Sequence, residues 1–325
     1  MISSGVQIVL FVQGLGNWLE WPMRFFTFIG TQEFFLLFLP TLYWSIDSRL
    51  GLRVGFILLT GSMVNGLFKM SLAGPRPYWV SDKVRAFALE SSFGVPSNHA
   101  EAAAGVWGTI AAHVRRAWVW AAAIAVIFLI GFSRIYLGVH FLHDVLLGWA
   151  LGGLTLWAFT AWWERVSAWV KALGFPKQIA LAFGVSMAFI LAAELIVRAN
   201  AGYTLPEEWI RNIERAGGAV PQPFSMSGPL TQAALLFGLS FGLAWMERRG
   251  GFRASGPPTN RVLCYVIGLL GLAILWFGLG EVLPRGEGLG PYILRYLRYA
   301  LVGAWVTGGA PWLFFRFNLV AKSGR

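Results

Sequence analysis

The sequence contains little cysteine and little charge, and both shortages narrow the class of protein. Cys264 is the only cysteine among the 325 residues, so no disulfide can form within the chain. Charged residues make up 13% of the chain and hydrophobic residues 57%, with a mean hydropathy of +0.62. An ordinary soluble domain has about 25% charged residues. The composition therefore indicates a protein that crosses a bilayer several times.

Other absences exclude further classes. The net charge is +11, but Lys and Arg are scattered singly between apolar stretches, so we expect no nucleic-acid partner. The sequence has no His-Glu-x-x-His spacing, and we expect no metal ion. It also has no internal repeat. The first apolar stretch, 6–12, is short and lacks a preceding basic segment, so we predict an interfacial helix there and not a cleavable signal.

The apolar stretches predict an all-α membrane protein with about nine spanning helices. A helix needs about 20 apolar residues to cross the hydrocarbon core of a bilayer. The candidate spans are residues 24–45, 51–69, 98–113, 117–133, 141–163, 178–198, 228–247, 261–282 and 297–317. Two small-residue pairs, Gly148-x3-Gly152 and Gly238-x3-Gly242, predict close helix crossings.

A weak boundary near residues 164–177 divides the sequence into two parts. We predict an N-terminal interfacial segment at 1–23, a motif-bearing core at 24–165 and C-terminal spanning helices at 166–325. Lys and Arg fall more often on one side of the nine-span path, which predicts that this side and the C-terminus are cytoplasmic. The polar motifs described next then lie on the non-cytoplasmic side of the membrane.

Three short motifs carry the polar residues that stand out in this apolar chain. They lie at the ends of apolar stretches and read Lys69-x6-Arg76-Pro77, Pro96-Ser97-Asn98-His99 and Ser133-Arg134-x5-His140-x3-Asp144. A single cation at the end of a spanning helix is usually an interface anchor. The nine-span path, however, brings all three motifs to the same depth. Together their order and spacing indicate a phosphate site in the membrane.

The cations of these motifs suit a phosphoryl group. Displacement at phosphorus spreads negative charge over the equatorial oxygens, which fixed cations and N–H or O–H donors stabilise. Lys69, Arg76 and Arg134 supply the positive charge, and arginine can bind two oxygens at once. Ser97 and the backbone N–H groups at the start of helix 98–113 are expected to complete the site.

Two histidines and an aspartate form the candidate catalytic group. His140 and Asp144 are four residues apart on a predicted helix, so the carboxylate can bond one imidazole nitrogen and leave the other free to attack phosphorus. His99 then protonates the leaving oxygen and later deprotonates water. Either histidine alone is more commonly structural. Asp144 is the stronger indication, because an ionisable group at membrane depth costs about 2.5–3.5 kcal/mol on insertion scales.

The three motifs resemble the signature of the type-2 phosphatidic acid phosphatase superfamily. This superfamily includes lipid phosphate phosphatases, undecaprenyl-diphosphate phosphatases, glucose-6-phosphatases and vanadium haloperoxidases. The likeness covers about residues 30–165 and implies a six-helix phosphatase core without metal or cofactor. It implies His140 as nucleophile, Asp144 as its orienting partner and His99 as general acid. The phosphate ligands that it implies are Lys69, Arg76, Ser97, Asn98 and Arg134.

Asn98 is the one departure from the signature, which usually has glycine at this position. In the family this residue is thought to offer its backbone N–H to phosphate. Asparagine tolerates positive φ better than most residues, so we expect the donor to be kept. A second interpretation is helix capping by Ser97, Asn98 and Glu101, because Asn98-x-x-Glu101 fits a capping box.

The sequence leaves the substrate open between two classes. The stretch 74–79 and the nine-span count resemble the glucose-6-phosphatase branch, which cleaves a soluble sugar phosphate. Several aromatic residues near the motifs suit an acyl or prenyl chain, although aromatic belts are normal at this depth: Trp79, Phe87, Phe93 and Tyr136. We favour a lipid or polyprenyl phosphate over a small phosphate ester. A lipid phosphotransferase and a non-enzymatic lipid or anion transporter are the other functions that the sequence leaves open.

Overall fold

The protein, described here from a computed structural model, is built from helices. Residues 2–284 and 286–320 are described, and these residues contain no strand, which confirms the predicted all-α class. They form two compact units. Unit 1 comprises the described residues of Met1–Phe35, Val64–Thr160 and Ala193–Ser225, and unit 2 those of Leu36–Met63, Ala161–Ala192 and Met226–Arg325. The predicted three-part division along the sequence stays a prediction.

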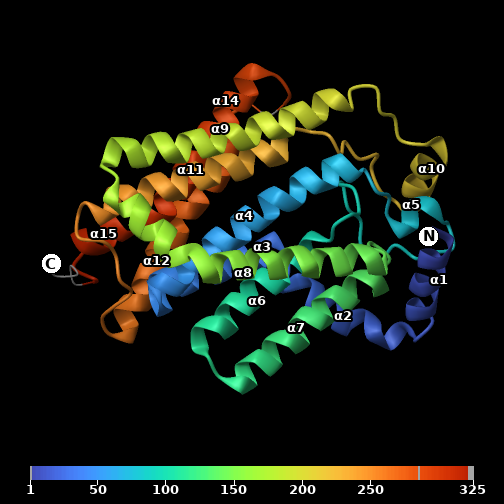
Figure 1. Cartoon of the computed structure of the whole chain (residues 1–325), viewed down its shortest axis with the longest axis horizontal. Coiled ribbons are helices and arrows are strands. Elements are labelled where there is room, and N and C mark those ends of the chain that lie inside the picture. Colours follow the sequence, from blue (N-terminus) through green and yellow to red (C-terminus); the bar gives the residue numbers. More distant parts are fainter. Residues whose placement is uncertain (1, 285, 321–325) are drawn as a thin grey trace. The chain divides into compact units, whose positions relative to one another are not determined.

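Unit 1 contains all three motifs. Its own elements are α1 (Ile2–Gln13), η1 (Asn17–Leu19), α2 (Glu20–Phe28), α5 (Pro77–Val80), α6 (Asn98–Val114), α7 (Ala117–Tyr136) and α10 (Glu207–Arg215). Four helices contribute residues to both units, namely α3 (Gln32–Pro40), α4 (Ser48–Leu72), α8 (Leu142–Ala172) and α9 (Phe175–Ala199). Figure 1 shows α6 and α7 packed as a hairpin, which turns at Arg115 in the left-handed conformation.

Unit 2 contains the C-terminal helices. Its own elements are η2 (Thr41–Ile46), α11 (Ser227–Glu247), α12 (Pro258–Ala273), η3 (Ile274–Gly278), α13 (Leu279–Val282), α14 (Leu289–Ala304), η4 (Trp305–Gly309) and α15 (Ala310–Arg316). Helices α11 and α14 pack closely, because a Cβ atom on Gly238 or Gly242 would collide with a carbonyl oxygen of α14. The predicted crossing at Gly238-x3-Gly242 is therefore confirmed.

The number of spanning helices differs from the expectation. Among the described residues, six helices are long and apolar enough to cross a bilayer, or seven if the bent pair Ile2–Gln13 and Asn17–Phe28 is one span. The count of nine is therefore not confirmed. The predicted span 24–45 is broken, because α2 ends at Phe28 and the π-helical turn η2 follows Pro40. Helix α6 has 17 residues, fewer than the about 20 of a typical span.

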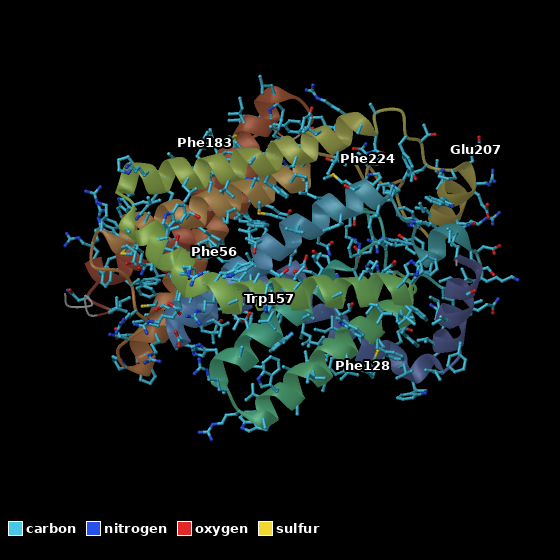
Figure 2. The ribbon with its side chains drawn as sticks, viewed as in Figure 1. Phe56, Phe128, Trp157, Phe183, Glu207 and Phe224 are labelled. Atoms are coloured by element: carbon cyan, nitrogen blue, oxygen red, sulfur yellow. The ribbon has the colours of Figure 1, made fainter. Side chains whose placement is uncertain are left out.

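Large apolar side chains remain exposed on the helices of each unit. Phe128 of α7 and Trp157 of α8, both in unit 1, are 54% and 56% exposed, and Phe183 in unit 2 is 47% exposed (Figure 2). Water-facing surfaces of soluble monomers rarely carry extended apolar patches of this kind. The exposed side chains therefore suit contact with lipid.

The N-terminal helix braces the loop between the first two motifs. The predicted helix at 6–12 is part of α1, and Val9 and Val12 are buried in the core of unit 1. The Gln13 amide donates to the carbonyl oxygens of Arg85 (2.8 Å) and Tyr136 (2.9 Å) and accepts from the backbone N–H of Arg85 (3.1 Å). These bonds tie the loop to the end of α7, where the third motif begins.

Helix α10 braces the same loop from the side of α5. The Asn212 amide donates to the Trp79 carbonyl oxygen at 2.9 Å, and the rings of Trp79 and Trp209 lie 6.1 Å apart. Phe93, which is fully buried, packs its ring 6.2 Å from Trp79 and 5.2 Å from Phe224. The loop is therefore an ordered part of the core of unit 1, so its carbonyl groups are fixed in place.

Candidate active site

Two glycines of α8 let the second motif approach the third. A Cβ atom on Gly148 would lie 2.5 Å from the Ser97 carbonyl oxygen, and one on Gly152 would collide with the carbonyl oxygen of Glu101. Only glycine permits backbones to approach this closely. The predicted crossing at Gly148-x3-Gly152 is confirmed, and the Ser97 N–H donates to the Asp144 carbonyl oxygen at 2.9 Å.

His140 and Asp144 make contact, but not as neighbours on one helix. Helix α8 begins at Leu142, so the prediction that both residues are helical was wrong. Asp144 lies in the first turn, and its Oδ2 accepts from the Phe141 N–H (2.9 Å) and lies 3.2 Å from His140 Nδ1. A side chain in the first turn commonly satisfies an N–H group that precedes the helix. The same bond that starts α8 thus places the carboxylate against the imidazole.

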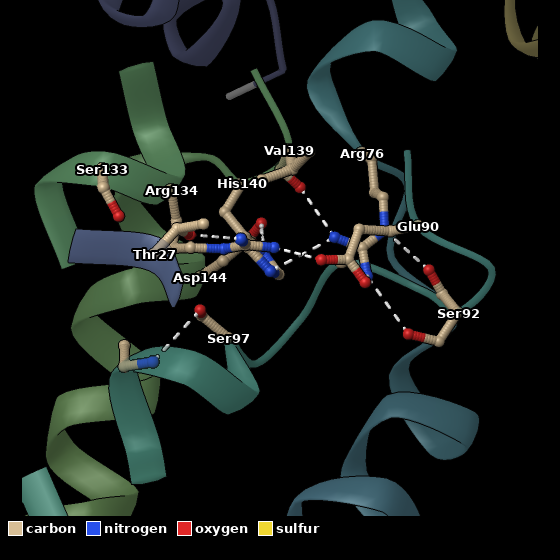
Figure 3. Close-up of polar contacts among 12 residues, drawn as sticks. Thr27, Arg76, Glu90, Ser92, Ser97, Ser133, Arg134, Val139, His140 and Asp144 are labelled. Atoms are coloured by element: carbon tan, nitrogen blue, oxygen red, sulfur yellow. Dashed lines mark hydrogen bonds and ion pairs between the residues drawn. The ribbon is translucent and has the colours of Figure 1, made fainter. Parts of the chain in front are cut away.

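The contacts of His140 fix its tautomer. Its Nε2 lies 3.2 Å from Nη1 of Arg76 (Figure 3), and a guanidinium can only donate. Nε2 therefore accepts, and the ring proton sits on Nδ1, where it is donated to Asp144. Burial lowers the pKa of His140 well below its usual value, and the charges of Arg76, Lys69, Arg134 and His99 lower it further. The ring is neutral at pH 7, with the lone pair of Nε2 directed toward the cations.

Arg76 and Lys69 hold the loop that leads to the second motif. Arg76 Nε donates to the Ser92 carbonyl oxygen (2.7 Å), Nη1 to that of Val139 (2.9 Å) and Nη2 to that of Phe93 (3.0 Å). Lys69 Nζ donates to the carbonyl oxygens of Phe93 (2.7 Å) and Gly94 (3.2 Å). Both cations are buried, and their bonds order the backbone around the catalytic group.

Arg134 is paired with Glu90, a residue that the sequence analysis did not single out. Arg134 Nη2 donates to Glu90 Oε1, and Nη1 donates to the Thr27 hydroxyl (Figure 3). Burial raises the pKa of the Glu90 carboxyl, but Arg134 and Arg76 together lower it to about 2. One signal was present in the sequence, because Glu90 and Asp82 are the acids in the loop between the first two motifs.

The second motif differs in detail from the expectation. Ser97 is the N-cap of α6 and accepts from the Ala100 N–H at 3.4 Å, while Asn98 is the first helical residue and does not have positive φ. The capping-box interpretation of Asn98 and Glu101 was therefore wrong, since Ser97 already fills the cap. Within the described residues, the buried carboxylate oxygens of Glu101 and the Nε2 of His99 have no hydrogen-bond partner.

The site as a whole brings the predicted residues together in unit 1. Direct contacts link Arg76, His140 and Asp144. Lys69 and Arg76 both donate to the Phe93 carbonyl oxygen, and the Glu90 carboxylate contacts both Arg76 and Arg134. Over the described part of the chain, no three His, Cys, Asp or Glu side chains form a group that could hold a metal ion. The arrangement is a neutral imidazole beside buried cations, which suits attack on an anionic group.

Comparison with known protein families explains this arrangement. The PAP2 superfamily model matches residues 50–168, and a model of the PAP2 superfamily phosphatase transmembrane extension matches residues 230–323. Phosphatidylglycerophosphatase B of Bacillus subtilis is 30% identical over 164 residues, which cover 46% of this chain and 77% of that protein. The chain belongs to the PAP2 superfamily. It is an integral membrane protein of a phosphatase family, as the motifs predicted.

Other similar proteins differ in how much of the chain they cover. Human glucose-6-phosphatase 3 is 26% identical over 347 residues, which cover 98% of this chain and 96% of that protein. Human sphingosine-1-phosphate phosphatase 2 is 30% identical over 146 residues, 43% of this chain and 37% of that protein. The crystal structure of a PAP2-type phosphatidylglycerolphosphate phosphatase from Bacillus subtilis covers 50% of this chain and 86% of its own, at 27% identity and a TM-score of 0.44.

Proposed function

We propose that this PAP2 phosphatase hydrolyses a phosphate monoester, or a terminal diphosphate, through a phosphohistidine formed on His140. The observation that carries the proposal is the orientation of the His140 ring. Its Nδ1 faces the Asp144 carboxylate, and its Nε2 faces Arg76 at 3.2 Å. The nucleophilic nitrogen thus faces the cations that attract the phosphoryl group, and the other nitrogen faces the group that stabilises the ring as it becomes positive.

The proposed reaction has two displacements at phosphorus. In the first, Nε2 of His140 attacks, the bond from phosphorus to the ester oxygen breaks, and protonated His99 gives its proton to the leaving alcohol. In the second, neutral His99 takes a proton from water, the hydroxide attacks phosphorus, and the bond from phosphorus to His140 breaks to release inorganic phosphate. The Asp144 carboxylate accepts a hydrogen bond from the Nδ1–H group of His140 in both steps.

The proposed phosphate ligands are the cations and the start of α6. Arg134 is the best placed, because its buried Nε has no hydrogen-bond partner within the described residues. Lys69 and Arg76 add positive charge while they hold the loop. Asn98 supplies a backbone N–H group at the N-terminus of α6, where an anion is favoured. The Ser97 N–H donates to the Asp144 carbonyl oxygen, so Ser97 contributes through its hydroxyl group.

For the substrate, the structure and the comparisons favour a soluble sugar phosphate over the lipid phosphate expected from the sequence. Of the four aromatic residues that the sequence offers as contacts for an acyl chain, Trp79, Phe93 and Tyr136 are fully buried in the core of unit 1. Phe87 is partly buried and stacks on Tyr136. The likeness to glucose-6-phosphatase 3 extends over 98% of the chain, whereas the likeness to the phosphatidylglycerophosphatase covers 46%. Partial likeness to lipid phosphatases makes a lipid phosphate the second candidate.

The membrane orientation is also part of the proposal. The distribution of Lys and Arg favours a cytoplasmic C-terminus and an active site on the non-cytoplasmic face. Cys264, the only cysteine, lies within α12 and is buried, so single cysteines introduced into a chain that lacks it would report accessibility without background. Labelling of a cysteine at Glu207 from the outside of intact cells, and not from the inside, is the expected result.

The function is tested by phosphate release from the detergent-solubilised protein. The panel is glucose 6-phosphate, phosphatidate, sphingosine phosphate and undecaprenyl diphosphate. We expect hydrolysis of at least one of these, loss of turnover in His140→Ala, and normal turnover in His113→Ala, which changes an exposed histidine of α6. Acid-labile phosphate on the wild-type chain but not on His140→Ala identifies the intermediate. No release from the whole panel by a folded sample would count against the proposal.

Two additional measurements separate the other two functions. A phosphotransferase would transfer the phosphoryl group to an added lipid or sugar acceptor, so labelled product would replace free phosphate. A transporter would move its substrate across vesicles equally well in His140→Ala, since binding to the cations does not need the imidazole.

A further inference from the structure

The Glu90 carboxylate contacts two of the cations that are proposed to bind phosphate. Its Oε1 accepts from Nη2 of Arg134, and its Oε2 lies 3.9 Å from Nη2 of Arg76 (Figure 3). Its side chain is 27% exposed, whereas those of the two arginines are 1% and 2% exposed. The carboxylate therefore lies between the buried cations and the more open side of the loop.

The backbone of Glu90 is fixed, so the side chain is the part that can move. The Tyr78 hydroxyl donates to the Glu90 carbonyl oxygen and accepts from the Glu90 N–H, each at 3.2 Å. Tyr78 is itself buried in the core of unit 1. Rotation about the side-chain bonds of Glu90 is enough to take the carboxylate from Arg134 toward its exposed side without disturbing the loop.

Two further buried groups of the candidate site have unused hydrogen-bonding capacity. Arg134 Nε and His99 Nε2 are buried, and neither has a hydrogen-bond partner among residues 2–284 and 286–320. Glu90 satisfies one edge of the Arg134 guanidinium and leaves this N–H group unused. A phosphoryl group offers three oxygens, so it can satisfy groups that a two-oxygen carboxylate at this position does not reach.

On the basis of the proposed function, we propose that Glu90 is a specificity-determining residue. Its carboxylate competes with every anion for Arg134, so that a dianionic phosphoryl group binds strongly enough to displace it and a monoanionic phosphodiester does not. A diester that displaces the Glu90 carboxylate puts one negative charge in the place of another. Its attraction to Lys69, Arg76 and Arg134 therefore gives little net gain in Coulomb energy. A monoester brings two negative charges. Its Coulomb attraction to the cations is therefore larger than the attraction lost when the carboxylate is displaced. Bilayer phospholipids are largely phosphodiesters, so this competition keeps them out of a site at membrane depth.

The test is equilibrium binding of two small probes to the full-length protein in detergent at pH 8. Inorganic phosphate is mostly dianionic there, and dimethyl phosphate is a monoanionic diester of similar size. We expect the wild type to prefer phosphate by about tenfold or more, and Glu90→Gln to bind both probes more tightly. Since the cost of displacing the carboxylate is removed for both probes, each should gain by a similar factor of about fivefold or more, and binding of the diester should become measurable. Glu207→Gln, which changes an exposed glutamate of α10 (Figure 2), should match the wild type.

Each outcome decides between distinct explanations. If Glu90→Gln binds the two probes no more tightly than the wild type, Glu90 only orients Arg134 and the competing role is refuted. If neither the wild type nor the variant binds phosphate, the proposed phosphatase site itself fails together with this inference. Glu90→Asp, which keeps the charge but shortens its reach, should bind both probes with intermediate affinity and supplies the same test if the glutamine variant does not fold.

Discussion

Replacement of Asp144 by asparagine tests the catalytic geometry with little change of shape. One carboxylate oxygen, Oδ2, accepts from both the Phe141 N–H (2.9 Å) and His140 Nδ1 (3.2 Å). The other, Oδ1, lies 3.1 Å from His143 Nε2. An asparagine whose carbonyl oxygen takes the place of Oδ2 keeps both bonds. The variant then loses only the negative charge beside His140.

The size of the effect follows from when that charge is needed. In the ground state His140 is neutral, so the carboxylate contributes a charge-assisted hydrogen bond of about 1.5–3 kcal/mol. As Nε2 bonds to phosphorus the ring becomes positive, and only the carboxylate can stabilise it. An aspartate-to-asparagine change beside a catalytic histidine of a serine protease lowers kcat about 10⁴-fold. We expect Asp144→Asn to lower kcat by about 10²–10⁴-fold with little change in KM.

Steady-state phosphate release and a rapid acid quench measure this effect. Phosphohistidine formation should slow in parallel with kcat, and thermal unfolding in detergent should show that the variant is folded. Asp82→Asn is the matched control, because Asp82 is exposed and pairs only across 3.7 Å with Arg215. A kcat for Asp144→Asn within about threefold of the wild type, in a folded sample, would refute the role given to the carboxylate.

Three further predictions follow from the same contacts. Gly148→Val should destabilise the protein by about 1–3 kcal/mol in thermal unfolding, because its Cβ would lie 2.5 Å from the Ser97 carbonyl oxygen. Gly153→Val, with no atom within 4 Å of the added Cβ, should not. Ser97→Ala should lower the unfolding free energy by about 1 kcal/mol, the usual value of an N-cap. Since burial and nearby cations lower the pKa of His140, the acidic limb of the kcat profile should lie below pH 6.5, and Lys69→Met should move it upward.

The candidate site could be predicted largely because its residues occur in linear motifs at helix ends. The cations and His99, His140 and Asp144 were all named from the sequence, and the structure brings them into one unit. The glycine spacing of α8 also predicted the crossing that joins two motifs. These features are local, since each depends on residues a few positions apart. They meet in the fold when the spanning helices bring the helix ends that carry them to the same depth.

The parts that were missed depend on tertiary structure. Glu90 has no motif of its own, and its position follows from a loop whose path is set by Tyr78 and by Gln13 and Asn212, two residues far away in the sequence. The count of nine spans was not confirmed for a related reason, since hydropathy alone does not show where a helix bends. Pro40 precedes a π-helical turn, and the stretch 24–45 is divided between several short elements.

The hydrogen bonds of the three cations also show that they are not equivalent. Lys69 and Arg76 donate most of their N–H groups to carbonyl oxygens of the 92–94 loop and of Val139. They therefore fix the backbone of the site and make its electrostatic potential positive. Arg134 bonds to two side chains and keeps a buried N–H unused, so it is free to exchange one anion for another. Loss of Lys69 or Arg76 should therefore disturb folding of the loop as well as binding, whereas loss of Arg134 should act mainly on phosphate affinity. Phosphate binding then depends most on Arg134, the cation whose hydrogen bond to Glu90 a substrate has to replace.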